Sequence, residues 1–309
     1  MTTRFVVAGG AGFIGSHVCT TLVAQGHEVL CLDNLLTGRE RNVAHLTGRP
    51  NFRFVQADVT APPPFEADFV LHLASPASPV QYRAKPVETL LANSLGTLRL
   101  LERAIEADAR LLFASTSEVY GDPLEHPQTE SYWGNVNPIG ERSCYDEGKR
   151  FGEALAMAMR TRGANVGIVR IFNTYGPRMD PLDGRVIPAF IGAGLSGKPF
   201  PIQGTGQQTR SFCFVSDLVD GLLKVAQDSS ANGEVFNLGN PEEVTMIELA
   251  ETVASLLGVE AKYDFLPAAV DDPYRRCPDI TRVRERFGWE PHRSLRSGLE
   301  ETIGAFSDE

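Results

Sequence analysis

Apolar and polar positions along the first half of the chain follow two different patterns. Short, nearly continuous apolar runs bounded by Gly, Asp or Pro are typical of buried strands, whereas longer segments repeat their apolar residues at helical spacing. Strands that alternate with helices indicate βαβ units and a parallel sheet with both faces covered. We therefore predict an α/β fold with a doubly wound parallel sheet. The predicted strands are 4–9, 27–33, 51–59, 68–75 and 110–115, and the predicted helices are 13–26, 86–107 and 143–162.

The pattern changes near residue 175. Beyond it Gly and Pro become frequent, as in LSGKPFPIQGTG at 195–206, and the strands become shorter. We expect such a region to pack over the C-terminal edge of the sheet, where open α/β sheets bind their ligands. We therefore predict a nucleotide-binding region at 1–175 and a smaller C-terminal substrate-binding region at 176–309. The boundary between them is soft, and we expect the two regions to be interleaved.

Composition narrows the range of partners. Of the 309 residues 42% are hydrophobic, and 29 basic against 39 acidic residues give a net charge of −10. An acidic chain repels phosphate backbones, so we expect no nucleic-acid partner. No apolar run approaches the roughly 20 residues that a membrane helix needs, so we expect no membrane association. The first strand begins almost at once, which we take to leave no room for a signal peptide.

The five cysteines are scattered singly along the chain. None of them stands at the spacing of a zinc site, so the sequence predicts no metal centre. Unpaired thiols in a chain of this length favour a reducing compartment, and we therefore expect a cytoplasmic protein.

A glycine-rich turn joins the first predicted strand to the first predicted helix. Its sequence, GGAGFIG at 9–15, places three glycines at GxxGxxG spacing. Such a turn lets the backbone approach a pyrophosphate, and the N-terminus of the following helix attracts the negative charge. Asp33 ends the second strand 18 residues after the last glycine, where it can bind both ribose hydroxyls and would repel a 2′-phosphate. The sequence thus predicts a Rossmann-type site for NAD, although Arg39 and Arg41 leave NADP open.

Tyr145 and Lys149 lie four residues apart in a predicted helix, and therefore on one face of it. A nearby ammonium and a positively charged nicotinamide ring would each stabilise the phenolate, lowering the tyrosine pKa from about 10 toward that of a general base. The polar cluster at 115–118 follows a buried strand and adds hydroxyls and a carboxylate. We predict a catalytic site here. Asp58, at the end of the third strand, has two interpretations, a contact to adenine or a turn residue.

These features together resemble the extended short-chain dehydrogenase/reductase family, and within it the UDP-glucuronate decarboxylases, also called UDP-xylose synthases. The resemblance covers essentially the whole chain. The matching stretches are HLASPASP at 72–79, ASTSEVYGDP at 114–123, YWGNVNPIGERSCYDEGKR at 132–150, RIFNTYGPRM at 170–179, DGRV at 183–186, GQQTRSFCFVSDLV at 206–219, NLGNPEE at 237–243 and DDPYRRCPDI at 271–280.

The resemblance implies an NAD-dependent decarboxylation of UDP-glucuronate to UDP-xylose with no net redox change. Tyr145, aided by Lys149 and Thr116, takes the proton of the sugar 4-hydroxyl while a hydride passes from C4 to NAD. The 4-keto acid loses carbon dioxide, C5 is protonated, and the hydride returns to C4. The catalytic residues that the resemblance implies are Thr116, Glu118, Tyr145, Lys149 and Arg276. The cofactor-binding residues that it implies are Gly9, Gly12, Phe13, Ile14, Gly15, Asp33, Asn34, Asp58, Val59, Leu73, Ser75, Tyr145 and Lys149. The substrate-binding residues that it implies are Tyr82, Ser117, Asn173, Arg185, Arg210 and Arg276.

The pair Ser117-Glu118 separates decarboxylases from related enzymes. Sugar 4,6-dehydratases carry Asp-Glu here, because their aspartic acid protonates the departing hydroxyl, and simple 4-epimerases usually have small neutral residues at both places. Serine is a poor acid, and decarboxylation has no leaving hydroxyl. Arg276 matches the family's arginine near the sugar carboxylate, which its planar fork can bind bidentately. We expect the neighbouring Arg275 to point elsewhere.

Several alternatives remain open from the sequence. A redox-neutral 4-epimerase of UDP-glucuronate or a related sugar nucleotide is the first, a 4,6-dehydratase is a weaker one, and a nucleotide-sensing scaffold without catalysis is a third. Leu91 departs from the family, since decarboxylases of higher organisms tend to have a lysine there, which we expect near the substrate. Apolar positions beyond those that sheet packing needs, near 86–107 and 143–162, together with the resemblance, predict a homodimer with a four-helix interface.

Overall fold

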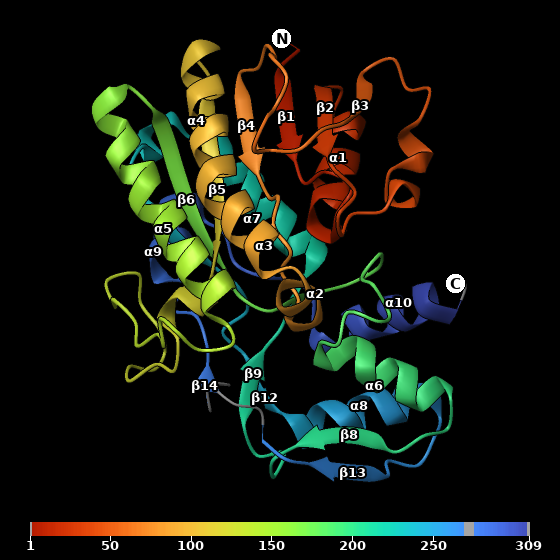
Figure 1. The fold of residues 1–309 in the computed structure, drawn as a ribbon. Coiled ribbons are helices and arrows are strands. Elements are labelled where there is room, and N and C mark those ends of the chain that lie inside the picture. The colour runs from red at the N-terminus through yellow and green to blue at the C-terminus, as the bar shows by residue number, and fades with distance from the viewer. Residues whose placement is uncertain (1, 269–274, 308–309) are drawn as a thin grey trace.

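The computed structural model describes residues 2–268 and 275–307. Within these residues, seven parallel strands form one sheet in the order β11–β6–β5–β4–β1–β2–β3 (Figure 1). All strands predicted in the first half are present, with ends within three residues of the predicted ones. The predicted doubly wound α/β fold is confirmed. The strands of this sheet are β1 Arg4–Ala8, β2 Glu28–Asp33, β3 Phe52–Gln56, β4 Phe69–His72, β5 Arg110–Thr116, β6 Asn165–Ile171 and β11 Val235–Leu238.

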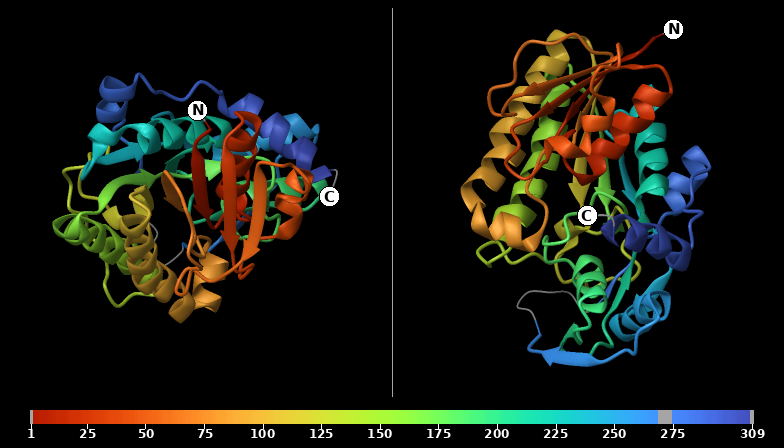
Figure 2. Two further views of the ribbon diagram at one scale, coloured as in Figure 1. Left: turned by 90° about the horizontal axis from the view of Figure 1, so that it is seen from above. Right: turned by 90° about the vertical axis from the view of Figure 1, so that its right-hand side faces the viewer.

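Alternate side chains of each strand enter two separate cores, one on each face of the sheet. In β1, Phe5 and Val7 belong to one core and Val6 and Ala8 to the other. Helices α1 and α7 cover the first face, whereas α4 and α5 cover the second, so that the sheet lies between two helical layers (Figure 2). This explains why the strands read as continuous apolar runs. The bounds are α1 Phe13–Ala24, α4 Thr97–Glu106, α5 Ser143–Met159 and α7 Val215–Gln227.

The helix predicted at 86–107 is divided into three parts. It begins as α3 (Pro86–Leu91), widens into a π-helical turn (η3, Ala92–Gly96) and continues as α4. Within the π turn the buried Asn93 donates from Nδ2 to the carbonyl of Thr89 and to Ser75 Oγ, both at 2.9 Å. The apolar periodicity predicts the helix but not this turn, because the turn depends on a contact with a residue outside the segment. Such turns are frequent near functional sites.

A smaller lobe lies at the C-terminal ends of the sheet strands (Figure 1). It holds the helices α6 and α8 and two small sheets, β8–β13 and β12–β9–β14. The chain does not stay in this lobe after residue 175, because α7 and β11 return to the large sheet, where β11 pairs with β6. The elements of the small lobe are α6 Val186–Leu195, α8 Met246–Leu257, β8 Phe200–Gln203, β9 Thr209–Ser211, β12 Glu243–Thr245, β13 Tyr263–Leu266 and β14 Arg275–Arg276.

The remaining elements are short connections or lie at the C-terminal end of the chain. Among the described residues, no helix is both long enough and apolar enough to pass through a membrane. The further elements are the short 3-10 helices η1 Glu40–Asn42, η2 Ala44–Leu46, η4 Ser117–Tyr120, η5 Arg160–Arg162 and η6 Ser229–Ala231, the helices α2 Pro79–Ala84, α9 Thr281–Phe287 and α10 Leu295–Ser307, and the paired strands β7 Thr174–Tyr175 and β10 Cys213–Phe214.

Candidate active site

A cavity of about 850 Å³ lies between the C-terminal ends of the sheet strands and the small lobe. It runs from the glycine-rich turn, past the end of β5, to β8 and β9. Most of the predicted site residues line this one cavity although they are distant in sequence. They are Gly9, Gly12, Phe13, Ile14, Gly15, Leu73, Ser75, Tyr82, Thr116, Ser117, Glu118, Tyr145, Lys149, Asn173, Arg185, Arg210 and Arg276.

The glycine-rich turn is shaped so that only glycine fits at two of its positions. Gly9 has a φ of +81°, and a Cβ there would lie 2.7 Å from the backbone of Ala74. A Cβ on Gly15 would overlap the carbonyl oxygen of Gly9. Gly12 caps α1, whose first turn carries no acidic residue. The turn therefore leaves room beside the free N–H groups of a helix N-terminus, which fits the pyrophosphate of a dinucleotide.

Asp33 organises this turn from the end of β2. Its Oδ2 accepts a hydrogen bond from the N–H of Ala11 at 3.0 Å, and its Oδ1 accepts one from Leu35 at 2.8 Å. Burial raises the pKa of the Asp33 carboxyl, although these two hydrogen bonds act in the opposite direction. Asp33 is not among the residues that line the cavity. Each carboxylate oxygen of Asp33 keeps a lone pair that can accept a hydrogen bond from a ribose hydroxyl. Asp33 also has a second role, since its hydrogen bonds to Ala11 and Leu35 hold the glycine-rich turn in place.

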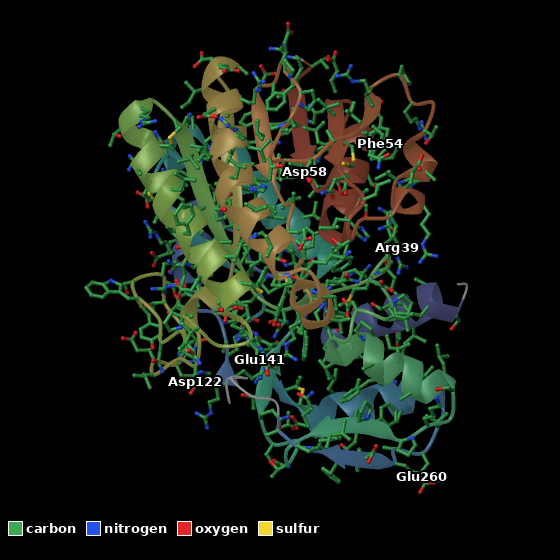
Figure 3. All side chains as sticks on the ribbon, in the orientation of Figure 1. Arg39, Phe54, Asp58, Asp122, Glu141 and Glu260 are labelled. Carbon is green, nitrogen blue, oxygen red and sulfur yellow. The ribbon has the colours of Figure 1, made fainter. Side chains whose placement is uncertain are left out.

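Three further predicted cofactor contacts lie outside the cavity wall. Asp58 is exposed near β3 (Figure 3), and its Oδ2 accepts a hydrogen bond from Asn34 Nδ2 at 2.7 Å. Its Oδ1 accepts from the backbone N–H of Thr60 at 2.8 Å. The buried Val59 packs in the core under α4. In the structure Asp58 acts as a turn residue, which is one of its two interpretations. Its hydrogen bond with Asn34 places both side chains beside the turn that follows β2.

Tyr145 and Lys149 lie on α5, on the face that meets the end of β5. Lys149 donates from Nζ to the carbonyl of Ala114 at 2.7 Å, and its Nζ lies 5.9 Å from the centre of the Tyr145 ring. Thr116, the last residue of β5, forms a side-chain hydrogen bond with Tyr145. The predicted trio of Thr116, Tyr145 and Lys149 is thus assembled, and all three side chains are buried.

The pKa values of the pair differ from the prediction. Burial raises the pKa of Tyr145 to about 12, and the hydrogen bond with Thr116 only partly opposes this rise. Burial also lowers the pKa of Lys149 to about 7. The predicted lowering of the Tyr145 pKa by the ammonium is therefore not found in the chain alone. The physical reason is that a buried site destabilises the charged form of both groups, so a further positive charge is needed to favour the phenolate.

Glu118 lies between two arginines. Arg276 donates from Nη1 and Nη2 to the two carboxylate oxygens, at 2.5 and 2.8 Å, and Arg142 donates from Nη2 to Oε2. Burial acts to raise the pKa of Glu118, but the charges of Arg276 and Arg142 outweigh it and lower this pKa to about 2. Glu118 is therefore a carboxylate. As predicted, Arg276 is buried and lines the cavity, whereas the neighbouring Arg275 is exposed.

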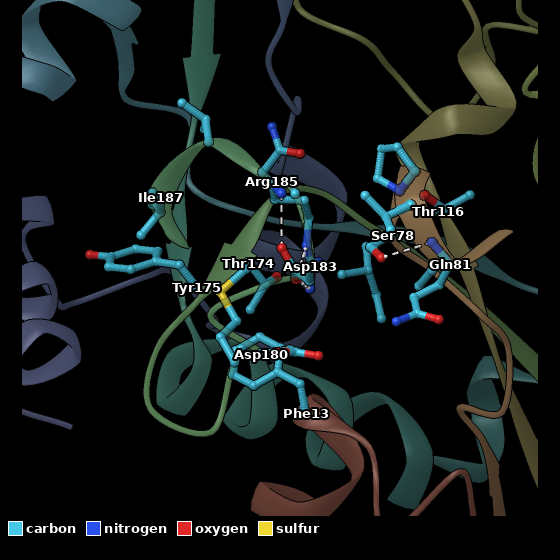
Figure 4. A pocket seen from close by; sticks show the side chains of 18 of the residues that line it. Phe13, Ser78, Gln81, Thr116, Thr174, Tyr175, Asp180, Asp183, Arg185 and Ile187 are labelled. Atoms are coloured by element: carbon cyan, nitrogen blue, oxygen red, sulfur yellow. Dashed lines mark hydrogen bonds and ion pairs between the residues drawn. The ribbon is translucent and has the colours of Figure 1, made fainter. Parts of the chain in front are cut away.

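The C-terminal end of the cavity carries the residues predicted to hold the nucleotide. Arg185 donates from Nε to Asp183 Oδ2 at 2.7 Å, an interaction visible in Figure 4. Arg210 on β9 donates from Nη1 to its neighbouring carbonyl, that of Thr209, at 2.7 Å. Asn173 follows β6, and its carbonyl accepts from the N–H of Cys213 at 2.9 Å. These three side chains face one cavity from three different segments.

The expectation for Leu91 is not met. It ends α3 with 43% of its surface exposed and is not among the residues that line the cavity. A side chain at this position therefore points away from the site. The presence of Leu91, where decarboxylases of higher organisms tend to have a lysine, therefore leaves the cavity wall of this chain unchanged.

Arg142 and Asp180 are among the charged residues of the cavity wall that the sequence did not assign to the site, and Arg39 was named there only as leaving NADP open. Arg142 contacts Glu118, as described above. Arg39 on the loop after β2 forms an ion pair with Asp180 at 2.5 Å, and this loop faces the small lobe (Figure 3). Arg142 stands three residues before Tyr145, at helical spacing, and this signal was sufficient to place both on one face. The pair of Arg39 and Asp180 joins segments 141 residues apart, so no local pattern predicts it.

Comparison with a family model places the chain among known proteins. Residues 5–239 match the model of the NAD dependent epimerase/dehydratase family. Among curated proteins, the chain is 52% identical over 304 residues to UDP-glucuronic acid decarboxylase 1 of Arabidopsis thaliana, covering 98% of this chain and 69% of that protein. It is 50% identical over 307 residues to UDP-glucuronic acid decarboxylase 1 of Danio rerio, covering 99% and 73%. The predicted resemblance to this group is confirmed.

Solved structures give the same architecture. UDP-glucose 4-epimerase of Thermotoga maritima, solved with UDP-glucose, superposes with a TM-score of 0.88 at 29% identity over 99% of each chain. A mutant UDP-glucuronic acid 4-epimerase of Bacillus cereus, in complex with UDP-4-deoxy-4-fluoro-glucuronic acid and NAD, gives a TM-score of 0.89 at 26% identity, also over 99% of each chain. The predicted use of NAD agrees with the family description. By its sequence and its fold, the chain belongs to the NAD dependent epimerase/dehydratase family, whose enzymes are extended short-chain dehydrogenases/reductases.

Proposed function

We propose that the protein converts UDP-glucuronate to UDP-xylose and carbon dioxide, with NAD as a cofactor that is not consumed. The observation that carries this proposal is the buried guanidinium of Arg276, which lines the same cavity as Thr116 and Tyr145. A 4-hydroxyl held by the trio at the end of β5 places the C5 carboxylate of a sugar acid within the same small part of the cavity. The identity of 52% to a UDP-glucuronic acid decarboxylase supports the same substrate.

Each residue of the trio has a defined task. Tyr145 accepts the proton of the sugar 4-hydroxyl, and Thr116 hydrogen-bonds to Tyr145 and orients that hydroxyl. Lys149 supplies positive charge beside the Tyr145 ring. NAD, when bound, supplies the reversible hydride acceptor that converts C4 to a carbonyl. When carbon dioxide leaves, the electron pair of the broken bond between C5 and the carboxyl carbon stays on the sugar, and this carbonyl accepts it. The same tyrosine returns its proton to O4 at the end of the reaction.

The carboxylate end of the substrate meets Glu118, Arg276 and Ser117. Arg276 Nε is buried and has no hydrogen-bond partner among residues 2–268 and 275–307, so one donor of this guanidinium remains unpaired by Glu118. Glu118, held ionised, positions Arg276 and a water near C5 and does not donate its own proton. Ser117 cannot protonate a leaving hydroxyl, and this favours decarboxylation over dehydration.

The remaining site residues have binding tasks in this proposal. The turn at Gly9–Gly15 holds the NAD pyrophosphate, Asp33 and Asn34 the adenosine ribose, and Asp58 and Val59 the adenine edge. Leu73 and Ser75 contact the nicotinamide side of the cofactor. Tyr82 contacts the sugar, and Asn173, Arg185 and Arg210 bind the diphosphate and uridine. The regions 1–175 and 176–309 are interleaved in this proposal, since Tyr82 contributes to the sugar site from the first of them.

Product analysis tests this function against the alternative 4-epimerase. The purified protein is incubated with UDP-glucuronate and NAD, and the products are identified by mass spectrometry and chromatography. We expect UDP-xylose and an equal amount of carbon dioxide, and neither from Tyr145→Phe, whose loss of a general base lowers the rate by roughly 100- to 10,000-fold. UDP-galacturonate without carbon dioxide would establish the epimerase instead.

We also propose a homodimer that forms through α3 and α5. Val87, Leu90 and Leu91 on α3 and Phe151 on α5 are between 41% and 61% exposed, and the two helices pack against each other. A second copy of the same face would bury these side chains in a four-helix interface. We expect a dimer by light scattering and a shift to monomer on Phe151→Glu. A monomeric native protein would contradict the proposal.

A cytoplasmic location completes the proposal. The cysteines at 19, 31, 144, 213 and 277 are all free and buried, which is typical of proteins in a reducing compartment. Localisation of a fluorescent fusion in intact cells tests this placement, and export of the fusion would contradict it.

A further inference from the structure

Glu118 contacts two arginines that come from distant parts of the chain. Arg276 belongs to β14 of the small lobe, and Arg142 precedes α5 as its N-terminal cap residue. Arg276 uses both of its terminal nitrogens on the two oxygens of Glu118. Arg142 reaches only Oε2. The two contacts are therefore unequal, and the stronger one involves the arginine that the substrate needs.

A sugar carboxylate in the cavity changes this arrangement. Under the proposed function, Arg276 binds that carboxylate. The guanidinium of Arg276 then either contacts both anions, the substrate carboxylate and Glu118, or loses its contact with Glu118. A second negative charge within a few ångströms also raises the energy of the ionised Glu118. Of the two arginines that contact Glu118, only Arg142 has no role in binding the substrate carboxylate.

The position of Arg142 is fixed relative to the catalytic tyrosine. Its carbonyl accepts hydrogen bonds from the N–H groups of Tyr145 at 2.9 Å and Asp146 at 3.0 Å. Its side chain is 10% exposed, and Arg142 lines the cavity. The contact between Arg142 and Glu118 therefore joins the start of α5 to the short helix η4, which follows the strand end at Thr116.

The second acid near Arg142 competes weakly for its charge. Arg142 Nε lies 3.9 Å from Asp146 Oδ2, beyond hydrogen-bond distance. Burial, followed by the charge of Glu118, raises the pKa of Asp146 to about 7 although both arginines oppose this. At neutral pH Asp146 therefore carries less negative charge than an exposed aspartate does. Among residues 2–268 and 275–307, the groups that face Glu118 include Arg142, Tyr145 and Asp146 at the start of α5, Tyr82 on α2 and Arg276 on β14.

We propose that Arg142 is a positioning residue that keeps Glu118 ionised and oriented while Arg276 engages the substrate carboxylate. This inference rests on the proposed function. Arg142 acts on the decarboxylation through Glu118, and its contribution is largest when the substrate is bound.

The pH profile of turnover separates this role from a structural one. We would measure kcat and KM for UDP-xylose formation from UDP-glucuronate between pH 4.5 and 8 for the wild type, Arg142→Met, Arg142→Lys and the matched control Arg99→Met, an exposed arginine on α4. Loss of one cation raises the Glu118 midpoint by roughly one to three pH units. We therefore expect the ratio of the kcat of Arg142→Met to that of the wild type to fall as the pH decreases toward 4.5, while the same ratio for Arg99→Met stays constant.

Two further comparisons complete the test. Arg142→Lys keeps the positive charge, and we expect it to restore most of the wild-type pH profile. In a Glu118→Gln background, Arg142→Met should change kcat by less than about 2-fold, because the group through which Arg142 acts is gone. A wild-type pH profile for Arg142→Met, or fully additive effects of the two substitutions, would overturn the inference. Absence of UDP-xylose from the wild type would instead refute the proposed function.

Discussion

The aromatic rings of Tyr82 and Tyr145 lie parallel, with their centres 5.2 Å apart and 5° between their planes. Tyr82 comes from α2 and Tyr145 from α5, so this stack joins two segments that both border the cavity. The Tyr82 hydroxyl is buried and has no partner within the described part of the chain. The stack holds the ring of the proposed general base in one plane, and the Tyr82 hydroxyl is a buried donor that no described residue pairs.

Substitution of Tyr82 separates these two roles. Tyr82→Phe keeps the stack and removes one hydrogen bond to the substrate, so we expect KM to rise by roughly 2- to 12-fold with little change in kcat. Tyr82→Ala also removes the support of the Tyr145 ring, and we expect kcat to fall by up to about 100-fold. Steady-state kinetics with UDP-glucuronate gives both values. Equal effects of the two substitutions would refute a role for the stack, and Tyr263→Phe on β13 is the control.

Substitution of Arg276 tests recognition of the carboxylate. We expect Arg276→Ala to lose about 2–4 kcal/mol of transition-state stabilisation on UDP-glucuronate, because a paired and desolvated cation is removed. The neighbouring Arg275→Ala is a matched control, since its side chain is exposed. The measurement is kcat/KM for each variant. Unchanged kinetics of Arg276→Ala would remove this arginine from the site.

Burial of Lys149 predicts an unusual dependence of stability on pH. The pKa of Lys149 is lowered to about 7 in the folded chain, whereas that of an unfolded lysine is about 10.4. Between these values the unfolded state binds one proton more, so the free energy of unfolding rises with pH. From pH 7 to pH 9 we expect the cofactor-free wild type to gain up to about 2 kcal/mol relative to Lys149→Met.

Urea unfolding of both proteins at the two pH values measures this gain. Other groups that titrate in this range contribute equally to both proteins, so they cancel in the difference. Parallel changes in the wild type and Lys149→Met would show that Lys149 keeps its proton in the folded state.

Substitution in the glycine-rich turn tests the cofactor site. Gly15→Ala places a methyl group on the carbonyl of Gly9, and we expect it to abolish NAD binding and to destabilise the fold by about 1–3 kcal/mol. Gly192→Ala is the matched control, because a Cβ at this position of α6 meets open space. We expect this control to bind NAD normally and to be more stable by about 0.5–1 kcal/mol. Calorimetric titration measures the affinity of both variants for NAD. Normal NAD binding by Gly15→Ala would contradict the assignment of the turn to the cofactor site.

The sequence predicts the sheet and the catalytic trio because their signals are local. Apolar runs determine each strand, the glycine spacing determines the turn, and the i, i+4 spacing of Tyr145 and Lys149 determines their common face. The strand end at Thr116 then meets this face because α5 packs directly on β5. These parts of the fold and of the site needed no information on distant contacts.

The remaining features depend on contacts between distant segments. The π turn around Asn93 depends on Ser75, and the two cations on Glu118 come from residues 24 and 158 positions away. The raised pKa of Tyr145 depends on complete burial, which a helical pattern alone does not determine. The sequence therefore predicted Glu118 and Arg276 but neither Arg142 nor the contacts that join the three residues.

The return of the chain from the small lobe to the large sheet has a consequence for any attempt to divide the protein. Strand β11 covers the outer side of β6 and is contributed by residues 235–238. A fragment that ends at residue 175 would lack it and would present the unpaired backbone of β6 to solvent. Exposed edges of this kind pair readily with other chains. We therefore expect such a fragment to aggregate, so that expression of the cofactor-binding half by itself requires a replacement for this strand.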